Sequence, residues 1–221
     1  MAKTYHQYCP VAHALDLVGE RWALLVVREL MFGPKRYTDL AEGLAGIGTN
    51  ILASRLRDLE QAGVVRKTKL PPPAGVSVYE LTEYGRRLDD VLLALGRWGS
   101  RSLGVPQPDD CWSMYAIQTS FRPEAAEGVD EVYELRFDDE AVVTLAVCDC
   151  MLEATPGPSD APDLVLEVEP GAMFDLVDRR LTTAEAVASG RARILTGKKA
   201  AFERLISMFE LRASGEARDA A

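Results

Sequence analysis

The chain has 221 residues, of which 48% are hydrophobic, and its formal net charge is −9. This length allows one or two domains, and the apolar content is enough to form a buried core. No apolar run approaches the roughly 18 residues that a membrane span needs, and no signal-peptide core follows the start, so we expect a cytoplasmic protein without a membrane partner.

The first part of the chain predicts four helices. They are expected over residues 10–18, 22–32, 37–44 and 50–62. Pro10 suits the first turn of a helix, and the second segment is apolar nearly all round, which predicts deep burial. Thr49 is expected to cap the fourth helix, and Gly63 is expected to end it.

The pattern then changes from the period of a helix to that of a strand. Residues 64–69 and 76–81 predict two strands that form a hairpin around the proline-rich loop 70–75. Thr82 is expected to cap a long helix that reaches about Leu103. The apolar positions of this helix follow helical spacing and are Leu88, Val91, Leu92, Leu95 and Trp98.

The segment 105–110 predicts a linker between two domains of different charge. Residues 1–104 carry 14 Lys and Arg against 11 Asp and Glu, a net charge of +3, whereas the remainder carries 11 against 23, a net charge of −12. The basic part suits contact with phosphates, and the acidic part should avoid them. We therefore expect one domain over 1–104, a second over 111–214 and a disordered tail over 215–221.

The second domain predicts a mixture of helices and strands. Strands are expected over 131–137, 141–152, 163–169 and 191–196, and helices over 183–189 and 198–212. A loop is expected over 156–162, which contains three prolines. The predicted fold class is therefore α+β, with an N-terminal winged helix-turn-helix domain followed by an α+β domain.

The fourth helix and the hairpin are the candidate DNA-reading parts. Leu52, Leu56 and Leu59 share the inward face of the helix, and polar residues occupy the opposite face, where Arg can pair with guanine and Asn with adenine. Lysines on the hairpin can neutralise phosphates. The candidate DNA-binding residues are Lys35, Arg36, Thr49, Asn50, Ser54, Arg55, Arg57, Arg66, Lys67 and Lys69. The alternatives are an ordinary solvated helix face and a solubilising edge strand.

Five stretches of the first domain carry a family resemblance. Residues 9–12, 17–22, 29–37, 52–65 and 79–85 are similar to the HxlR-type branch of the MarR-like winged helix-turn-helix regulators. The resemblance implies a homodimer, whose interface is formed by the first helix and the helix after the hairpin. It also implies a palindromic operator of double-stranded DNA with one half-site for each subunit. The apolar stripe of that last helix supports a dimer separately, and core within the domain is its alternative.

The end of the second domain resembles the sterol carrier protein type. The similar stretches are 163–169, 188–197 and 201–209. This resemblance implies a sheet backed by helices around an apolar cavity that holds a lipid-like molecule. The candidate ligand-binding residues are Trp112, Met114, Tyr115, Phe121, Phe137, Met173, Phe174, Met208 and Phe209. A solid core built from the same side chains is the alternative.

The four cysteines form no C-x-x-C pair. Cys9 precedes a proline at the start of the first helix, where a helix N-terminus favours a thiolate. The HxlR resemblance makes Cys9 the redox candidate, with Cys111 as the nearest partner thiol and simple packing as the alternative. Cys148 and Cys150 are two apart in a predicted strand, so we expect both to be buried on one face.

No catalytic constellation, phosphate-binding loop or metal-ligand spacing stands out, so we expect neither an enzyme nor a cofactor or metal. The favoured function is a dimeric DNA-binding transcriptional regulator, a repressor, that responds to a small apolar ligand in its second domain. Two alternatives stay open. One is a redox- or electrophile-sensing repressor acting through Cys9, and the other is an enzyme fused to a DNA-binding domain.

Overall fold

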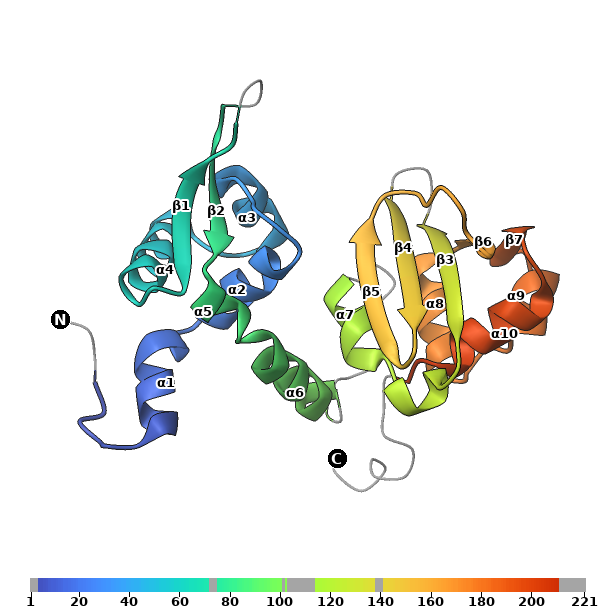
Figure 1. The fold of residues 1–221 in the computed structure, drawn as a ribbon, viewed down its shortest axis with the longest axis horizontal. Coiled ribbons are helices and arrows are strands. Elements are labelled where there is room, and N and C mark those ends of the chain that lie inside the picture. Colours follow the sequence, from blue (N-terminus) through green and yellow to red (C-terminus); the bar gives the residue numbers. More distant parts are fainter. Residues whose placement is uncertain (1–3, 72–74, 101, 103–113, 138–140, 211–221) are drawn as a thin grey trace. The chain divides into compact units, whose positions relative to one another are not determined.

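A computed structural model describes residues 4–71, 75–100, 102, 114–137 and 141–210 (Figure 1). The chain divides into two compact units, Met1–Leu92 and Leu93–Ala221. The predicted linker lies outside the described residues, so the boundary at residue 104 stays a prediction. Within the described part, every helix is too short or too polar to cross a membrane.

The first unit opens with the four predicted helices. These are α1 (Pro10–Val18), α2 (Ala23–Met31), α3 (Tyr37–Gly43) and α4 (Thr49–Gln61). Two details differ from the prediction. Thr49 is the first residue of α4 and Gly48 is its N-cap, without a side-chain hydrogen bond. Leu25 of α2 is 39% exposed, because only one side of this short helix meets the core.

The predicted hairpin is confirmed, and it gains a third short segment. Strands β1 (Val65–Lys69) and β2 (Ser77–Leu81) pair antiparallel, with Lys67 opposite Tyr79. The backbone of Lys35 also pairs with Tyr79, through N–H to O distances of 3.0 and 2.8 Å. Four helices followed by this hairpin make a winged helix-turn-helix.

The prediction of a single long helix after the hairpin is wrong. The chain forms α5 (Glu83–Arg86) and, after a turn, α6 (Asp89–Ser100). Thr82 is the expected cap, since its Oγ accepts the Gly85 N–H at 3.0 Å. Gly85 lies so close to Val64 that a Cβ atom would come within 2.1 Å of the Val64 carbonyl oxygen. This packing fixes α5 against the hairpin, so the chain turns before α6 continues.

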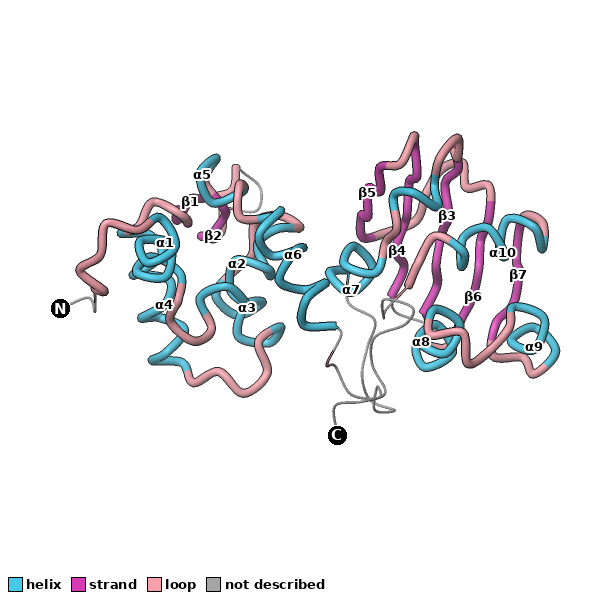
Figure 2. The backbone as a smooth tube through the Cα atoms, turned by 90° about the horizontal axis from the view of Figure 1, so that it is seen from below, coloured by secondary structure: helices cyan, strands magenta, loops and turns pink. Residues whose placement is uncertain are grey.

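The second unit has one five-stranded sheet with helices on one face (Figures 1 and 2). The strands are β3 (Asp130–Phe137), β4 (Ala141–Cys148), β5 (Met151–Pro156), β6 (Leu164–Val168) and β7 (Ala192–Thr196). Their order is β5-β4-β3-β6-β7, with β3 and β6 parallel and the other pairs antiparallel. The helices are α7 (Met114–Ser120), α8 (Pro170–Val177), α9 (Thr183–Ala188) and α10 (Lys199–Ser207), with a 3₁₀ turn over Pro123–Ala126.

The mixed helix and strand content is confirmed, but three details of the second unit were wrong. The strand predicted over 141–152 is two strands, because Asp149 and Cys150 adopt positive φ values of 44° and 66° and reverse the chain. Helices α7 and α8 were not predicted at all. The closing helix stops at Ser207. At its end, the Arg179 guanidinium donates hydrogen bonds to the backbone carbonyls of Ile206 at 3.0 Å and Phe209 at 3.1 Å.

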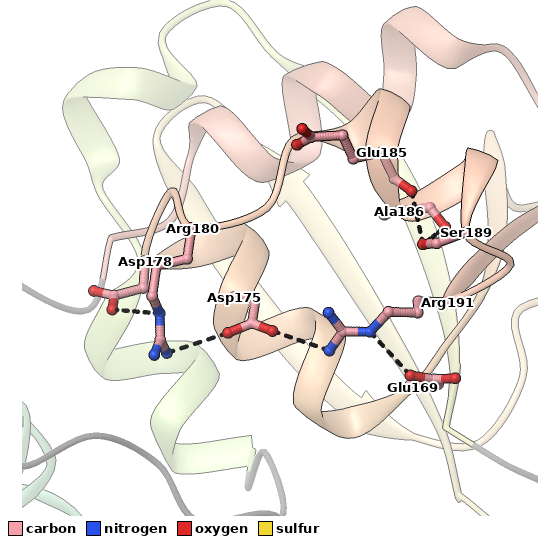
Figure 3. A network of polar contacts seen from close by, with 8 residues as sticks. All are labelled: Glu169, Asp175, Asp178, Arg180, Glu185, Ala186, Ser189 and Arg191. Carbon is pink, nitrogen blue, oxygen red and sulfur yellow. Dashed lines mark hydrogen bonds and ion pairs between the residues drawn. The ribbon is translucent and has the colours of Figure 1, made fainter.

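A chain of ion pairs ties α8 to the residue before β7 (Figure 3). Arg191 donates to Glu169 at 3.1 Å and to Asp175 at 2.9 Å. Asp175 also pairs with Arg180 at 3.3 Å, and Arg180 reaches Asp178 at 3.1 Å. All five side chains keep some exposure to water, so the network fixes geometry more than it adds stability.

Candidate nucleic-acid interface

Helix α4 has one buried and one open face, as its sequence predicts. Leu52, Leu56 and Leu59 are at most 2% exposed and fix the helix in the core of the first unit. Asn50 and Arg57 are exposed on the other side. Tyr37 at the start of α3 donates its hydroxyl to the Thr49 carbonyl at 2.7 Å, which joins α3 to the first turn of α4.

Arginine side chains of α4 differ in their freedom. Arg57 makes no side-chain hydrogen bond or ion pair with any residue that the structure describes, so its guanidinium is free to meet a base edge. Arg55 pairs with Asp58 at 3.0 Å and Glu20 at 3.9 Å, and its side chain is only 18% exposed. These partners hold Arg55 against the protein, so of the two arginines Arg57 is the better candidate for a base contact.

Ile51 was not predicted as a site residue. Its side chain is 47% exposed in the first turn of α4, beside Asn50. A large apolar side chain on the polar face of a helix would gain from a partner, and the methyl group of thymine is the apolar feature of the major groove. The sequence did contain a signal, because Ile51 precedes the buried Leu52 and so falls outside the leucine stripe.

The cations of the wing lie on its first strand. Arg66, Lys67 and Lys69 of β1 are exposed, although Arg66 pairs with Glu80 at 2.8 Å. The Lys67 ammonium lies 5.5 Å from the centre of the ring of Tyr79, its partner on the opposite strand, a cation–π contact across the hairpin. Residues 72–74 at the wing tip are outside the described residues.

Lys35 and Arg36 lie between the helices and the wing. The Lys35 ammonium is 2.6 Å from Glu29, which also pairs with Arg28 at 2.8 Å. The Lys35 ammonium is therefore already paired with a carboxylate. Arg36 is exposed, and its backbone N–H donates to Asp39 at 2.9 Å, which caps α3. Of the two, Arg36 is the freer phosphate contact.

Taken together, these side chains give the first unit a surface with two chemical roles. Helix α4 offers hydrogen-bonding and apolar groups that can distinguish base pairs. The wing offers cations that can hold a phosphate backbone whatever its sequence. The candidate DNA-binding residues are thus all on α4, on the wing or in the segment before α3, and they belong to one compact unit.

The candidate ligand-binding residues lie elsewhere, in the core of the second unit. Seven of them, all but Trp112 and Met114, are at most 9% exposed, and they are Tyr115, Phe121, Phe137, Met173, Phe174, Met208 and Phe209. Met114 packs against this core, and Trp112 lies outside the described residues. An open pocket of about 400 Å³ does lie beside α8, α9 and α10. Its walls include Leu176, Leu181 and Ile206, and none of the predicted residues.

The cysteines are only partly where they were expected. Cys9 is the N-cap of α1 and is half-buried. The expectation that Cys148 and Cys150 are buried is wrong, since Cys148 is exposed and Cys150 is half-buried in the turn between β4 and β5. Cys111 lies outside the described residues. Within the described part of the chain, no three His, Cys, Asp or Glu side chains come together as a metal site.

Comparison with known proteins places the first unit among transcriptional regulators. The family model described as HxlR-like helix-turn-helix matches residues 17–106. An uncharacterized HTH-type transcriptional regulator of Synechocystis is 38% identical over 42% of this chain and 68% of its own length. One of Mycobacterium tuberculosis is 41% identical over 44% of this chain, but only 61% of its own length.

The HTH-type transcriptional regulator YodB of Bacillus subtilis is 36% identical over 42% of this chain and 84% of its own length. The solved structure of reduced YodB is 33% identical over 46% of this chain and all of its own chain, with a TM-score of 0.39. The structure of quinone-bound YodB is 36% identical over 41% of this chain and 97% of its own, with a TM-score of 0.36. The family match ends at residue 106, so the second unit lies almost wholly outside it.

Proposed function

The chain belongs to the HxlR-like helix-turn-helix family, and from this premise we propose that it is a sequence-specific repressor that binds a palindromic operator as a homodimer. The observation that carries the proposal is the open face of α4, where Asn50 and Arg57 are exposed next to a wing of cations. A recognition helix lies in the major groove, and a two-fold dimer places two such helices about one DNA turn apart.

Exposed apolar side chains support the dimer. Helix α6 leaves Val91 52%, Leu95 45% and Trp98 71% exposed. Helix α1 leaves Val11 68% and Leu15 45% exposed. Apolar stripes of this kind on monomers mark interaction sites, and the same two helices were expected to form the dimer interface.

Two variants test the assignment of the DNA surface. Arg57→Ala should weaken operator binding by about 1–3 kcal/mol and relax the preference for one base, because it removes a base-edge contact. Lys67→Ala should weaken binding to all DNA sequences alike and reduce the salt dependence of binding, because it removes a phosphate contact. The measurement is a fluorescence anisotropy titration with operator and unrelated DNA at several salt concentrations. Glu60→Gln of α4 is the control variant, and wild-type binding by both test variants would show that α4 and the wing are misassigned.

For the signal, we propose a small apolar ligand bound by the second unit. Seven of the predicted lining residues are buried in the core, so the open pocket beside α8 and α10 is the better-supported place. Leu176, Leu181 and Ile206 give it an apolar wall. A panel of fatty acids, sterols and aromatic compounds should then raise the melting temperature of the protein by linkage. Leu181→Glu should abolish the effect, and an unchanged melting temperature across the panel would contradict the proposal.

A second candidate signal is oxidation of Cys9. Its thiol is half-buried at the N-cap of α1, where no side chain caps the helix and Pro10 follows. The relative YodB has been obtained with quinone bound and after diamide treatment. Under this proposal, diamide releases the protein from operator DNA, and Cys9→Ser abolishes the release. Release that persists in Cys9→Ser would exclude Cys9 as the sensor.

A further inference from the structure

Three of the four residues at the turn between β4 and β5 carry sulfur. They are Cys148, Cys150 and Met151, whereas the whole chain has only four cysteines and six methionines. Cysteine is among the most often buried residue types. Here Cys148 is exposed, Met151 is 70% exposed and Cys150 is half-buried, so packing does not account for the cluster.

The register of the sheet brings two of the sulfur atoms onto one face. Cys148 is the antiparallel partner of Met151 across β4 and β5, and of Asp130 across β3 and β4. Side chains of directly opposed residues point to the same face, with Cβ atoms about 4.5–5.5 Å apart. The thiol and the thioether are therefore neighbours on the open face of the sheet.

The third sulfur belongs to a strained residue. Cys150 has φ of 66° and follows Asp149 at 44°, a pair of positive values that a two-residue hairpin loop of type I′ requires. Asn and Gly are preferred at such positions because they tolerate the left-handed region, which cysteine does not favour. Strain of this kind is often kept at functional sites.

The surroundings of the turn are acidic. Asp149 lies in the turn itself, and Asp130 is the antiparallel partner of Cys148 across β3 and β4. The negative charges of these two carboxylates favour a bound cation.

We propose that the sulfur atoms of Cys148, Cys150 and Met151 bind one Cu(I) ion. Thiolate and thioether are soft donors, and the combination selects Cu(I) over harder cations. Each thiol releases its proton to solvent as its sulfur–copper bond forms, and no electron is transferred. Zinc sites in proteins are built from Cys, His, Asp and Glu, a ligand set that does not include the thioether of methionine.

The test is a competition titration of the reduced, full-length protein under oxygen-free conditions. Cu(I) is presented as its coloured complex with bathocuproine disulfonate, and the loss of colour measures transfer to the protein. We expect the wild type to take up one equivalent at this turn. The double variant Cys148→Ser, Cys150→Asn should lose that equivalent, and asparagine keeps the positive φ of the turn accessible. Met151→Leu, at an exposed position, should weaken the uptake while leaving the melting temperature unchanged.

Cys9→Ser is the matched control, since Cys9 belongs to the other unit, and it should keep the wild-type uptake. The proposal is overturned if the double variant takes up as much copper as the wild type. It is equally overturned if Met151→Leu has no effect on copper affinity, or if equimolar zinc displaces the bound copper. The Met151 arm applies even if the double variant fails to fold.

Discussion

At the residue scale, the capacity of the first unit to contact DNA depends on which of its cationic side chains already pair with a carboxylate. Glu20 and Asp58 hold Arg55, and Glu29 holds Lys35, whereas Arg57 stays free of described partners. An engaged cation must lose its partner before it contacts DNA, and a free one does not. Arg57 and Ile51 are therefore the residues of α4 whose replacement should change base preference most.

Ile51 gives a prediction about one methyl group. If its exposed side chain contacts thymine, replacing that thymine by uracil removes only the methyl and should weaken operator binding by the wild type. The loss should disappear in Ile51→Ala, because the apolar partner is already gone. The measurement is a double-mutant cycle on operators with single uracil substitutions. If every uracil operator loses the same affinity with both proteins, Ile51 is not a reader.

Glu134 gives a prediction about acid stability. Its side chain is 2% exposed and accepts hydrogen bonds from Arg136 at 2.7 Å and from the Ser159 N–H at 3.0 Å. Burial raises the pKa of Glu134, but the Ser159 and Arg136 hydrogen bonds outweigh it and leave the pKa below its ordinary value of 4.5. The charged form therefore stabilises the fold above pH 4.5, and this contribution is lost as the pH falls through the lower folded-state value.

Glu134→Gln should accordingly lower the free energy of unfolding by about 1 kcal/mol at neutral pH, since it weakens charge-assisted hydrogen bonds. Its stability should also fall less steeply with acid. Urea unfolding from pH 3 to pH 7 measures both effects, with the exposed Glu153→Gln as control. Parallel pH profiles for Glu134→Gln and the wild type would contradict this account.

At the element scale, α6 is short of partners on one face. Leu92 is buried, but Val91, Leu95 and Trp98 are 45% exposed or more. These residues lie three or four apart, so they form one stripe along the helix. An amphipathic helix with its apolar stripe in water would gain from a second copy of the same helix.

The substitution Leu95→Glu should therefore convert a dimer into a monomer, because it places a charge in the centre of the stripe. Multi-angle light scattering of the full-length protein measures the mass. Arg97→Glu changes charge in the same helix outside the stripe and is the control. A wild type that is monomeric at micromolar concentration would remove the basis of this prediction.

At the scale of the whole molecule, opposite charges are divided between the two parts of the chain. Residues 1–104 carry +3 and the whole chain carries −9. The acidic remainder should repel a polyanion over distances of about one Debye length, roughly 10 Å at 0.1 M salt. Non-specific DNA binding is almost wholly electrostatic, so it should be the most affected.

The fragment 1–104 should therefore bind unrelated DNA more tightly than the full chain at low salt, and the difference should shrink as salt is added. The effect is measured by fluorescence anisotropy titrations at salt concentrations from about 50 to about 300 mM, since the affinity of proteins for DNA falls steeply with salt over this range. Circular dichroism of the fragment checks that it is folded. Equal affinities at low salt would mean that the acidic part is too far from the DNA to matter.

The sequence by itself determined the helices and the hairpin of the first unit, but not the break between α5 and α6. The spacing of Leu52, Leu56 and Leu59 identifies α4, and the change of period at Val64 identifies the hairpin, because local periodicity directly reflects which side of an element is buried. The same periodicity predicted a mixed helix and strand domain after it. It predicted Thr82 as a cap, because that role depends on neighbours only three residues away.

Only the tertiary structure decided which side chains are free and which are buried. Arg55 is held in part by Glu20, thirty-five residues earlier, and periodicity carries no information about such distant partners. Seven of the nine apolar residues assigned to a cavity are buried in a core, because burial looks the same in sequence whether or not space remains beside it. Cys148 is exposed and Cys150 is only half-buried, because two positive φ angles, which no apolar pattern encodes, turn one predicted strand into two.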